Sequence, residues 1–272
     1  MRTIARRLPV LLATLVAGCS AAPAPCLVAH PGIGGYGVLL VRNGPAPPGC
    51  TNLPLTAFAF DENGNPKVTP LPARGSPAVF FDGWRTDLYN STPDISSPEE
   101  LAIHSDRMGF PSDLGTVVRT AWPTMPDAQD RCTVKDVPAM TDTTADPLGI
   151  GGAETELTYK INSITFLEGV KYAGLQFTAD VEATFGTCTS SYTASGLAPN
   201  VYEGFLYGNA NNCSNDADCD PNADPAAGRA VGSGYNPDFN VVCRKDIGAA
   251  FVNPDGSGVC FTPDGATFPF LK

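Results

Sequence analysis

An alternation of apolar and polar side chains over residues 172–185 constrains the fold more than any other feature of this chain. The apolar positions are Ala173, Leu175, Phe177, Ala179, Val181, Ala183 and Phe185. The positions between them include Tyr172, Gln176, Thr178, Asp180, Glu182 and Thr184. A period of two is typical of a β-strand with one face on a core and the other in water. We therefore expect a one-faced antiparallel sheet.

The same period appears upstream, with one interruption. One face stays apolar from Leu157 to Ile161, and beyond Asn162 the apolar positions move to Ile164 and Phe166. Such a shift by one residue is what a β-bulge produces, because the extra residue is left out of the pairing. A Glu-Gly dipeptide separates this run from the first, so we expect one long antiparallel hairpin.

Two strands are expected nearer the N-terminus, at residues 36–42 and 53–60, the second followed by a turn rich in Asn and Gly. After residue 204 Asn, Asp, Gly and Pro become frequent and apolar periodicity fades. The expected fold class is mainly β: an antiparallel β-sandwich or meander over residues 26–204. Residues 205–272 should form a disulfide-rich, loop-rich C-terminal region packed on it.

One short helix is expected between Ser97 and Gly109. Ser97 is a suitable N-cap, Pro98 would occupy the first helical position, and Glu100 would complete a capping box. A helix of about ten residues is marginal by itself. It would therefore depend on docking against the rest of the fold.

The N-terminus carries an export signal. Arg2, Arg6 and Arg7 form a basic start, and the apolar run Val10–Val16 is too short to span a bilayer. The run leads into Leu-Val-Ala-Gly-Cys, ending at Cys19, which resembles the lipobox of bacterial lipoproteins. The resemblance implies cleavage before this cysteine and attachment to membrane lipid through acyl chains such as palmitate. The alternative is an ordinary secretory signal in which the cysteine has no role.

Residues 1–18 are then a signal peptide, and residues 19–25 form a short, proline-bearing, lipidated tether. Ser20, directly after the lipobox cysteine, resembles the outer-membrane sorting signal of many Gram-negative bacteria. We expect a cell-envelope protein that is lipid-anchored in the outer membrane and faces the periplasm or the cell surface.

Cysteine number predicts disulfides. The chain has nine cysteines, and without the lipobox cysteine eight remain: Cys26, Cys50, Cys132, Cys188, Cys213, Cys219, Cys243 and Cys260. An even number in an exported chain favours four bridges, and a soft-metal site is disfavoured because no Cys-x-x-Cys pair occurs. Bridges Cys26–Cys50 and Cys132–Cys188 fit the expected strands, but spacing leaves the pairing open.

An acidic tract lies between two of these cysteines. Its oxygen-bearing side chains alternate along the chain, at Asp216, Asp218, Asp220, Asn222 and Asp224. This resembles the first half of an EF-type calcium loop, but Pro221 replaces the glycine of the turn and Ala227 the bidentate glutamate. Calcium is thus the one candidate cofactor, and the alternative is a solvated, turn-forming loop.

Charge disfavours some partners. The chain has 17 basic and 28 acidic residues, and loss of three arginines with residues 1–18 leaves a net charge of about −14. No nucleic-acid partner is expected, because no cluster of Lys and Arg follows Arg7 to displace counterions. The same charge opposes adsorption to anionic lipid, so attachment should rest on the acyl chains alone.

A wider likeness runs from about Phe177 to Cys260. It comprises Gly-Thr-Cys-Thr at residues 186–189, Gly-Leu-Ala-Pro at residues 196–199, and the segment at residues 223–239. These segments resemble a group of delta-proteobacterial outer-membrane lipoproteins of unassigned function. The resemblance implies an envelope location and supplies no catalytic residues.

No catalytic signature stands out. The only histidines are His30 and His104, and neither has a neighbour that defines a role. Trp84 and Trp122 could line a sugar or peptide groove, although core positions are favoured. The sequence favours a non-enzymatic structural, adhesive or partner-binding role toward an envelope or extracellular ligand. A secreted hydrolase of extracellular polymer and a calcium-dependent binding module remain alternatives.

Overall fold

The computed structural model describes residues 25–28, 35–50, 59–60, 66–67, 79–89, 100–105, 117–142, 156–168, 171, 174–199, 212–227, 233–245 and 258–272. Within this part of the chain the fold is mainly antiparallel β, as predicted. Cys19, His30, the expected turn at residues 61–65 and the proposed domain boundary at residue 204 lie outside the described residues. Of the strand expected at residues 53–60, only the end is described, as the two-residue strand β2.

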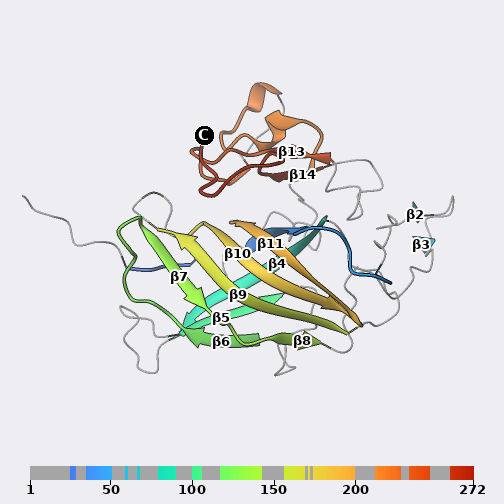
Figure 1. Ribbon diagram of the computed structural model, residues 1–272. Coiled ribbons are helices and arrows are strands. Elements are labelled where there is room, and N and C mark those ends of the chain that lie inside the picture. The colour runs from blue at the N-terminus through green and yellow to red at the C-terminus, as the bar shows by residue number, and fades with distance from the viewer. Residues whose placement is uncertain are drawn as a thin grey trace, which may run out of the picture.

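Most strands belong to one nine-stranded sheet with the order β6-β5-β4-β1-β11-β10-β9-β7, in which β8 also pairs with β9. Its strands are β1 (Tyr36–Arg42), β4 (Val79–Tyr89), β5 (Glu100–Ser105), β6 (Val117–Ala121), β7 (Arg131–Lys135), β8 (Met140–Asp142), β9 (Leu157–Leu167), β10 (Gln176–Phe185) and β11 (Cys188–Leu197). Two meanders, β4-β5-β6 and β9-β10-β11, are joined through β1 (Figure 1). A short pair, β2 (Ala59–Phe60) with β3 (Pro66–Lys67), lies apart.

The predicted hairpin is confirmed, including its bulge. Strands β9 and β10 pair from Phe166 and Phe177 onward, and the register shifts between Asp180 and Val181. Asp180 lies opposite Ser163 and Val181 opposite Ile161, so Asn162 is the extra residue. The bulge therefore restores the apolar side chains of β9 to the inward face.

The sheet curls until it is nearly closed, and aromatic rings fill its interior. Trp84 on β4 contacts Tyr159 on β9 and Phe177 on β10, with ring centroids 5.9 and 5.6 Å apart. Tyr36 on β1 contacts the rings of Phe166 and Phe177. Three strands separate β4 from β9 in the sheet order, so these contacts require strong curvature.

The expected helix at Ser97–Gly109 is wrong where the structure describes it. Residues 100–105 form β5, which pairs with β4 on one side and β6 on the other. Leu101 and Ile103 are fully buried. A short capping box is worth little beside two strand pairings and this burial, so tertiary context overrides the local signal. The helical turns of the described residues are the 3-10 turns η3 (Asp216–Cys219) and η4 (Pro225–Ala227).

The C-terminal region forms a small sheet of order β12-β14-β13 above one end of the large one (Figure 1). Its strands are β12 (Asn212–Cys213), β13 (Val242–Arg244) and β14 (Gly258–Phe261). It contacts the large sheet where the Phe270 N–H donates to Gln176 Oε1 at 2.7 Å and the Asn236 side chain donates to the Lys171 carbonyl at 2.8 Å. Gln176, expected in water, is therefore fully buried.

All eight predicted cysteines form disulfides, but the two suggested pairings are wrong. The bridges are Cys26–Cys132, Cys50–Cys188, Cys213–Cys243 and Cys219–Cys260. Strand order explains the exchange: Arg42 at the end of β1 lies opposite Tyr192 on β11, so the chain leaving β1 runs toward the start of β11 at Cys188. The segment that carries Cys26 instead lies beside Thr124, where the chain approaches Cys132 on β7.

Candidate functional site

The acidic tract folds into a capped 3-10 turn. Asn215 is the N-cap of η3, and Asp218 Oδ2 accepts from the N–H groups of Ser214 and Asn215 at 2.7 and 3.2 Å. Asp216 Oδ1 accepts from the Cys243 N–H at 2.8 Å and so ties the turn to β13. The carboxylates stabilise the loop in the manner of helix caps.

The rest of the tract behaves in the same way. Asp220 Oδ1 accepts from both the backbone and the side-chain nitrogen of Asn222, at 2.8 and 3.0 Å. No three of the four aspartates come close enough to share one ion. Calcium binding by Asp216, Asp218, Asp220, Asn222 and Asp224 therefore stays a prediction, and it would require these caps to rearrange.

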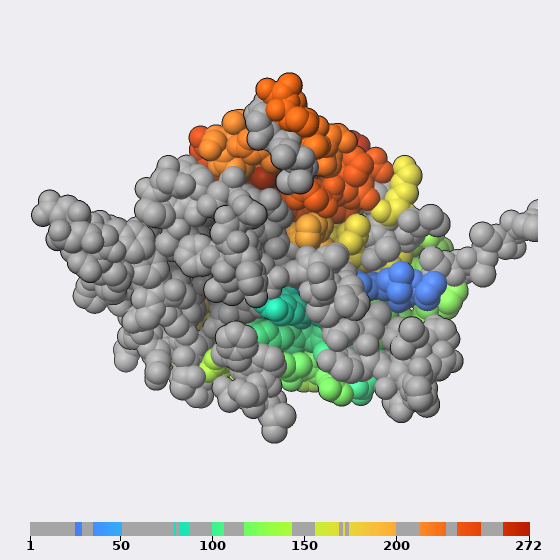
Figure 2. Space-filling view, turned by 180° about the vertical axis from the view of Figure 1, so that it is seen from behind, coloured from blue at the N-terminus to red at the C-terminus, as the bar shows by residue number. Residues whose placement is uncertain are grey.

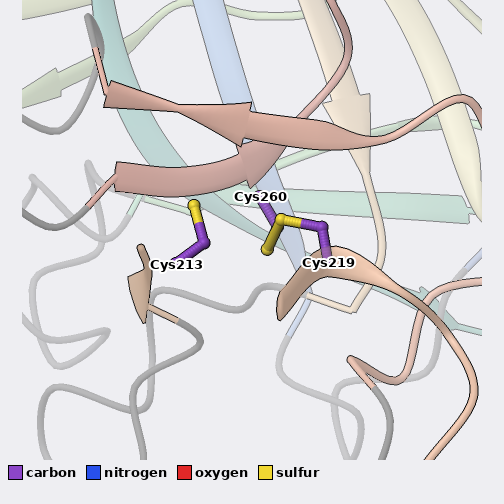
Figure 3. A group of neighbouring side chains, drawn as sticks. All are labelled: Cys213, Cys219 and Cys260. Atoms are coloured by element: carbon purple, nitrogen blue, oxygen red, sulfur yellow. A yellow bond between two sulfur atoms is a disulfide. The ribbon is translucent and has the colours of Figure 1, made fainter. Parts of the chain in front are cut away.

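One group with metal-ligand geometry exists among the described residues. The sulfurs of Cys213, Cys219 and Cys260 lie within 4.8 Å of one another and are buried. Figure 3 shows the sulfur–sulfur bond of Cys219 and Cys260 with Cys213 beside it. Cys213 is itself bonded to Cys243, so no thiolate is present to bind a soft metal.

A pocket of about 150 Å³ opens beside the acidic turn. Asp216 and Asp220 line it from η3 and the residue after it, and Tyr235, Phe239 and Lys272 are among its other lining residues. Tyr235 OH donates to the Cys260 carbonyl at 2.9 Å, and burial raises the pKa of this phenol, so it stays neutral. The pocket combines two acidic residues with two aromatic residues that are almost wholly buried.

The sequence predicted no catalytic residue, and of its two histidines the structure describes only His104. His104 lies on β5 and is 8% exposed, and Ser105 follows it, so the two side chains point to opposite faces. Ser105 Oγ donates to Asp82 Oδ2 at 2.7 Å, as do Trp84 Nε1 and Tyr159 OH at 3.1 and 2.9 Å. Asp82 thus links three strands inside the core.

Both tryptophans are core residues, the position that the sequence favoured over a groove. Trp84 is fully buried and Trp122 is 5% exposed. Trp122 contacts the Phe166 ring and its Nε1 donates to the Cys26 carbonyl at 3.2 Å. The favoured core interpretation is confirmed, and sugar stacking on these two rings has no support.

Sequence reasoning missed a buried carboxylate, Glu168, which it treated as a turn residue. Glu168 is 1% exposed, and neither carboxylate oxygen has a hydrogen-bond partner among the described residues. Burial raises its pKa to about 7, an effect that the nearby Leu27 backbone offsets only in part. Ile164 and Phe166 point inward at alternate positions of β9, and continuing the alternation reaches position 168. That alternation is the signal that could have revealed the burial of Glu168.

A family model named MlpA matches residues 87–199. The name suggests a membrane lipoprotein. The match spans β5 to β11 and ends where the large sheet ends, before the C-terminal region and its pocket. No curated protein and no solved structure matches the chain. Among the described residues, no helix combines the length and apolar character needed to cross a bilayer.

Proposed function

We propose that this protein is a lipid-anchored protein of the outer membrane that binds a partner and performs no catalysis. The lipobox ending at Cys19 carries the anchor. The MlpA match supports the anchor independently, because the match rests on residues 87–199 and not on the signal sequence. Ser20 supports outer-membrane sorting, with the folded body in the periplasm or at the cell surface.

Metabolic labelling with palmitate tests the anchor. The unchanged protein should incorporate label and fractionate with the outer membrane, whereas Cys19→Ala should lose both properties. Ser20→Ala is the matched control for labelling, since it leaves the acylated cysteine in place. Label that survives in Cys19→Ala, or a purified protein that retains residues 1–18, would contradict the anchor.

The pocket at η3 supports the binding role. A volume of about 150 Å³ is well below the several hundred Å³ of cofactor and drug-sized sites, so it suits one side chain of a partner. Asp216 and Asp220 supply negative charge, Tyr235 supplies a ring, and Lys272 offsets part of that charge. We therefore assign it to a cationic side chain, for which carboxylates and aromatic rings are complementary.

An NMR titration with L-arginine amide and its neutral analogue L-citrulline amide tests this assignment. Arginine amide should shift resonances around the pocket and citrulline amide should not. Asp220→Asn should weaken binding several-fold, and Lys272→Ala should strengthen it. Asp264→Asn, an exposed carboxylate of the same region outside the pocket, is the control. Equal binding of both probes, or none, would contradict the assignment.

A further inference from the structure

The point at which the tether joins the folded body is rigid. Cys26 is fully buried and bonded to Cys132 at the start of β7. Its N–H donates to the Thr124 carbonyl at 3.3 Å, and its own carbonyl accepts from Trp122 Nε1 at 3.2 Å. In Figures 1 and 2 this blue segment lies beside the green chain that leads into β7, at one edge of the molecule.

A short tether keeps this edge near the membrane. If Cys19 carries the acyl chains, as proposed above, residues 19–25 can span at most about 25 Å even when fully extended. Other parts of the body can turn away from the bilayer, but the surface around Cys26 cannot. Side chains exposed there meet lipid more often than those on any other surface.

Two exposed apolar side chains directly follow this join in the sequence. Four large hydrophobic side chains are exposed among the described residues, and two of them, Leu27 and Met125, directly follow the hydrogen-bonded pair Cys26 and Thr124. Leu27 is 37% and Met125 48% exposed. The other two, Val41 and Val79, lie opposite each other on β1 and β4.

We propose that Leu27 and Met125 form the surface through which the folded body contacts the bilayer, at the boundary of headgroups and acyl chains. This inference rests on the proposed lipid anchor. The adjoining turn is acidic, since Asp127 and Asp130 are exposed and Asp127 Oδ1 accepts from the Arg131 N–H at 3.0 Å. The contact is therefore apolar and does not depend on anionic lipid.

Methionine methyl groups give a direct test in the unchanged protein, with a variant needed only to assign the resonance. The chain has four methionines, and Met140 is fully buried, so it serves as an internal control for Met125. Mature acylated protein, which begins at Cys19 and is labelled at methionine methyls, is placed in zwitterionic nanodiscs that contain spin-labelled lipid. The Met125 resonance, assigned through Met125→Leu, should lose most of its intensity, whereas Met140 should keep most of its own.

Leu27→Met extends the test to the second side chain, and Val41→Met is its matched control. Tyr36 OH donates to the Gly174 carbonyl, and the Leu27 backbone lies against Gly174, so the start of β1 is at the tether end. Val41 lies five residues beyond Tyr36 on β1, which places it about 17 Å from the start of the strand. Methionine at 27 should be broadened and methionine at 41 much less.

The outcomes separate the two proposals. Acylated protein, verified by mass, in which Met125 keeps its intensity would overturn the contact surface and leave the anchor intact. Equal broadening at positions 41 and 125 would mean that the body has no preferred orientation, and would also overturn it. Protein without acyl chains would overturn both.

Discussion

Long strands and aromatic rings stabilise the large sheet, whereas the C-terminal region depends on cross-links and caps. In the large sheet, β4 and β9 have 11 residues each, and Trp84, Tyr159, Phe166 and Phe177 meet inside. In the C-terminal region the strands have two to four residues, and disulfides join β12 to β13 and η3 to β14. The large sheet also carries two disulfides, Cys26–Cys132 and Cys50–Cys188, which fasten incoming chain segments to a core that alternation builds. In the loop-rich C-terminal region, with fewer apolar residues, the bridges should carry a larger share of the stability.

Removing a central ring should have the largest effect. Phe177 is fully buried and contacts the rings of Tyr36, Trp84 and Phe166. Phe177→Ala should lower the free energy of unfolding by about 3–5 kcal/mol, because it removes buried apolar surface and leaves a cavity. Urea unfolding measures this effect. Phe268→Ala, which removes a half-buried ring of the C-terminal region, is the comparison variant. It should lower the free energy of unfolding clearly less than Phe177→Ala does. Equal losses would mean that the two regions share one kind of core.

Removing the Cys219–Cys260 bridge should have the second largest effect, and that effect should be confined to the C-terminal region. Cys219 and Cys260 are 41 residues apart, so their bridge should contribute about 3 kcal/mol. In Cys219→Ala/Cys260→Ala, amide exchange should accelerate across β12 to β14, while β9 and β10 stay protected. Loss of protection in both regions would contradict their independent stabilisation.

Glu168 connects stability of the large sheet to pH. Its pKa rises from 4.5 to about 7 on folding, so the folded state favours the protonated acid. Its contribution is fully present below pH 4.5 and is lost as the pH rises to about 7. Glu168→Gln mimics the protonated acid. The free energy of unfolding of this variant, relative to that of the unchanged protein, should therefore be higher at mildly basic pH than at acidic pH. The expected difference is about 2 kcal/mol after allowance for solvent screening.

Urea unfolding at the two pH values, without reductant, measures that difference. Glu156→Gln is the control, since Glu156 is exposed just before β9. Its stability relative to the unchanged protein should not vary with pH. A pH-independent difference for Glu168→Gln would mean that the carboxyl stays ionised in the fold.

Local patterns predicted β1, β9 and β10 because side-chain period is a local property, but they did not predict β4, β6, β7, β8 or β11. The alternation over residues 172–185 and the bulge at Asn162 follow from neighbours in sequence. The capping box at Ser97 is equally local, but β4 and β6 decide the conformation of Leu101 and Ile103. Long-range pairing outweighs a local helix signal of this size.

Disulfide pairing and the pocket could not be predicted, because both depend on strand order. Cys50 reaches Cys188 only because β1 lies beside β11, a neighbour more than 140 residues away along the chain. The pocket draws on three separate segments, around Asp216, Tyr235 and Lys272. Sequence spacing draws attention to the acidic tract, but it cannot reveal which backbone groups the carboxylates accept from.

The smallest effect should come from the caps of the C-terminal region. Asp218 Oδ2 accepts from two backbone N–H groups, at Ser214 and Asn215, so Asp218→Ala should cost about 1 kcal/mol. Thermal unfolding measures this cost, and Asp264→Ala is the control for loss of an exposed charge.

Adding calcium to both proteins makes this prediction more specific. If the tract only caps η3, adding calcium should leave the melting temperature of both proteins unchanged. If it binds the ion, calcium should raise that of the unchanged protein and have a smaller effect on Asp218→Ala, since one ligand is gone.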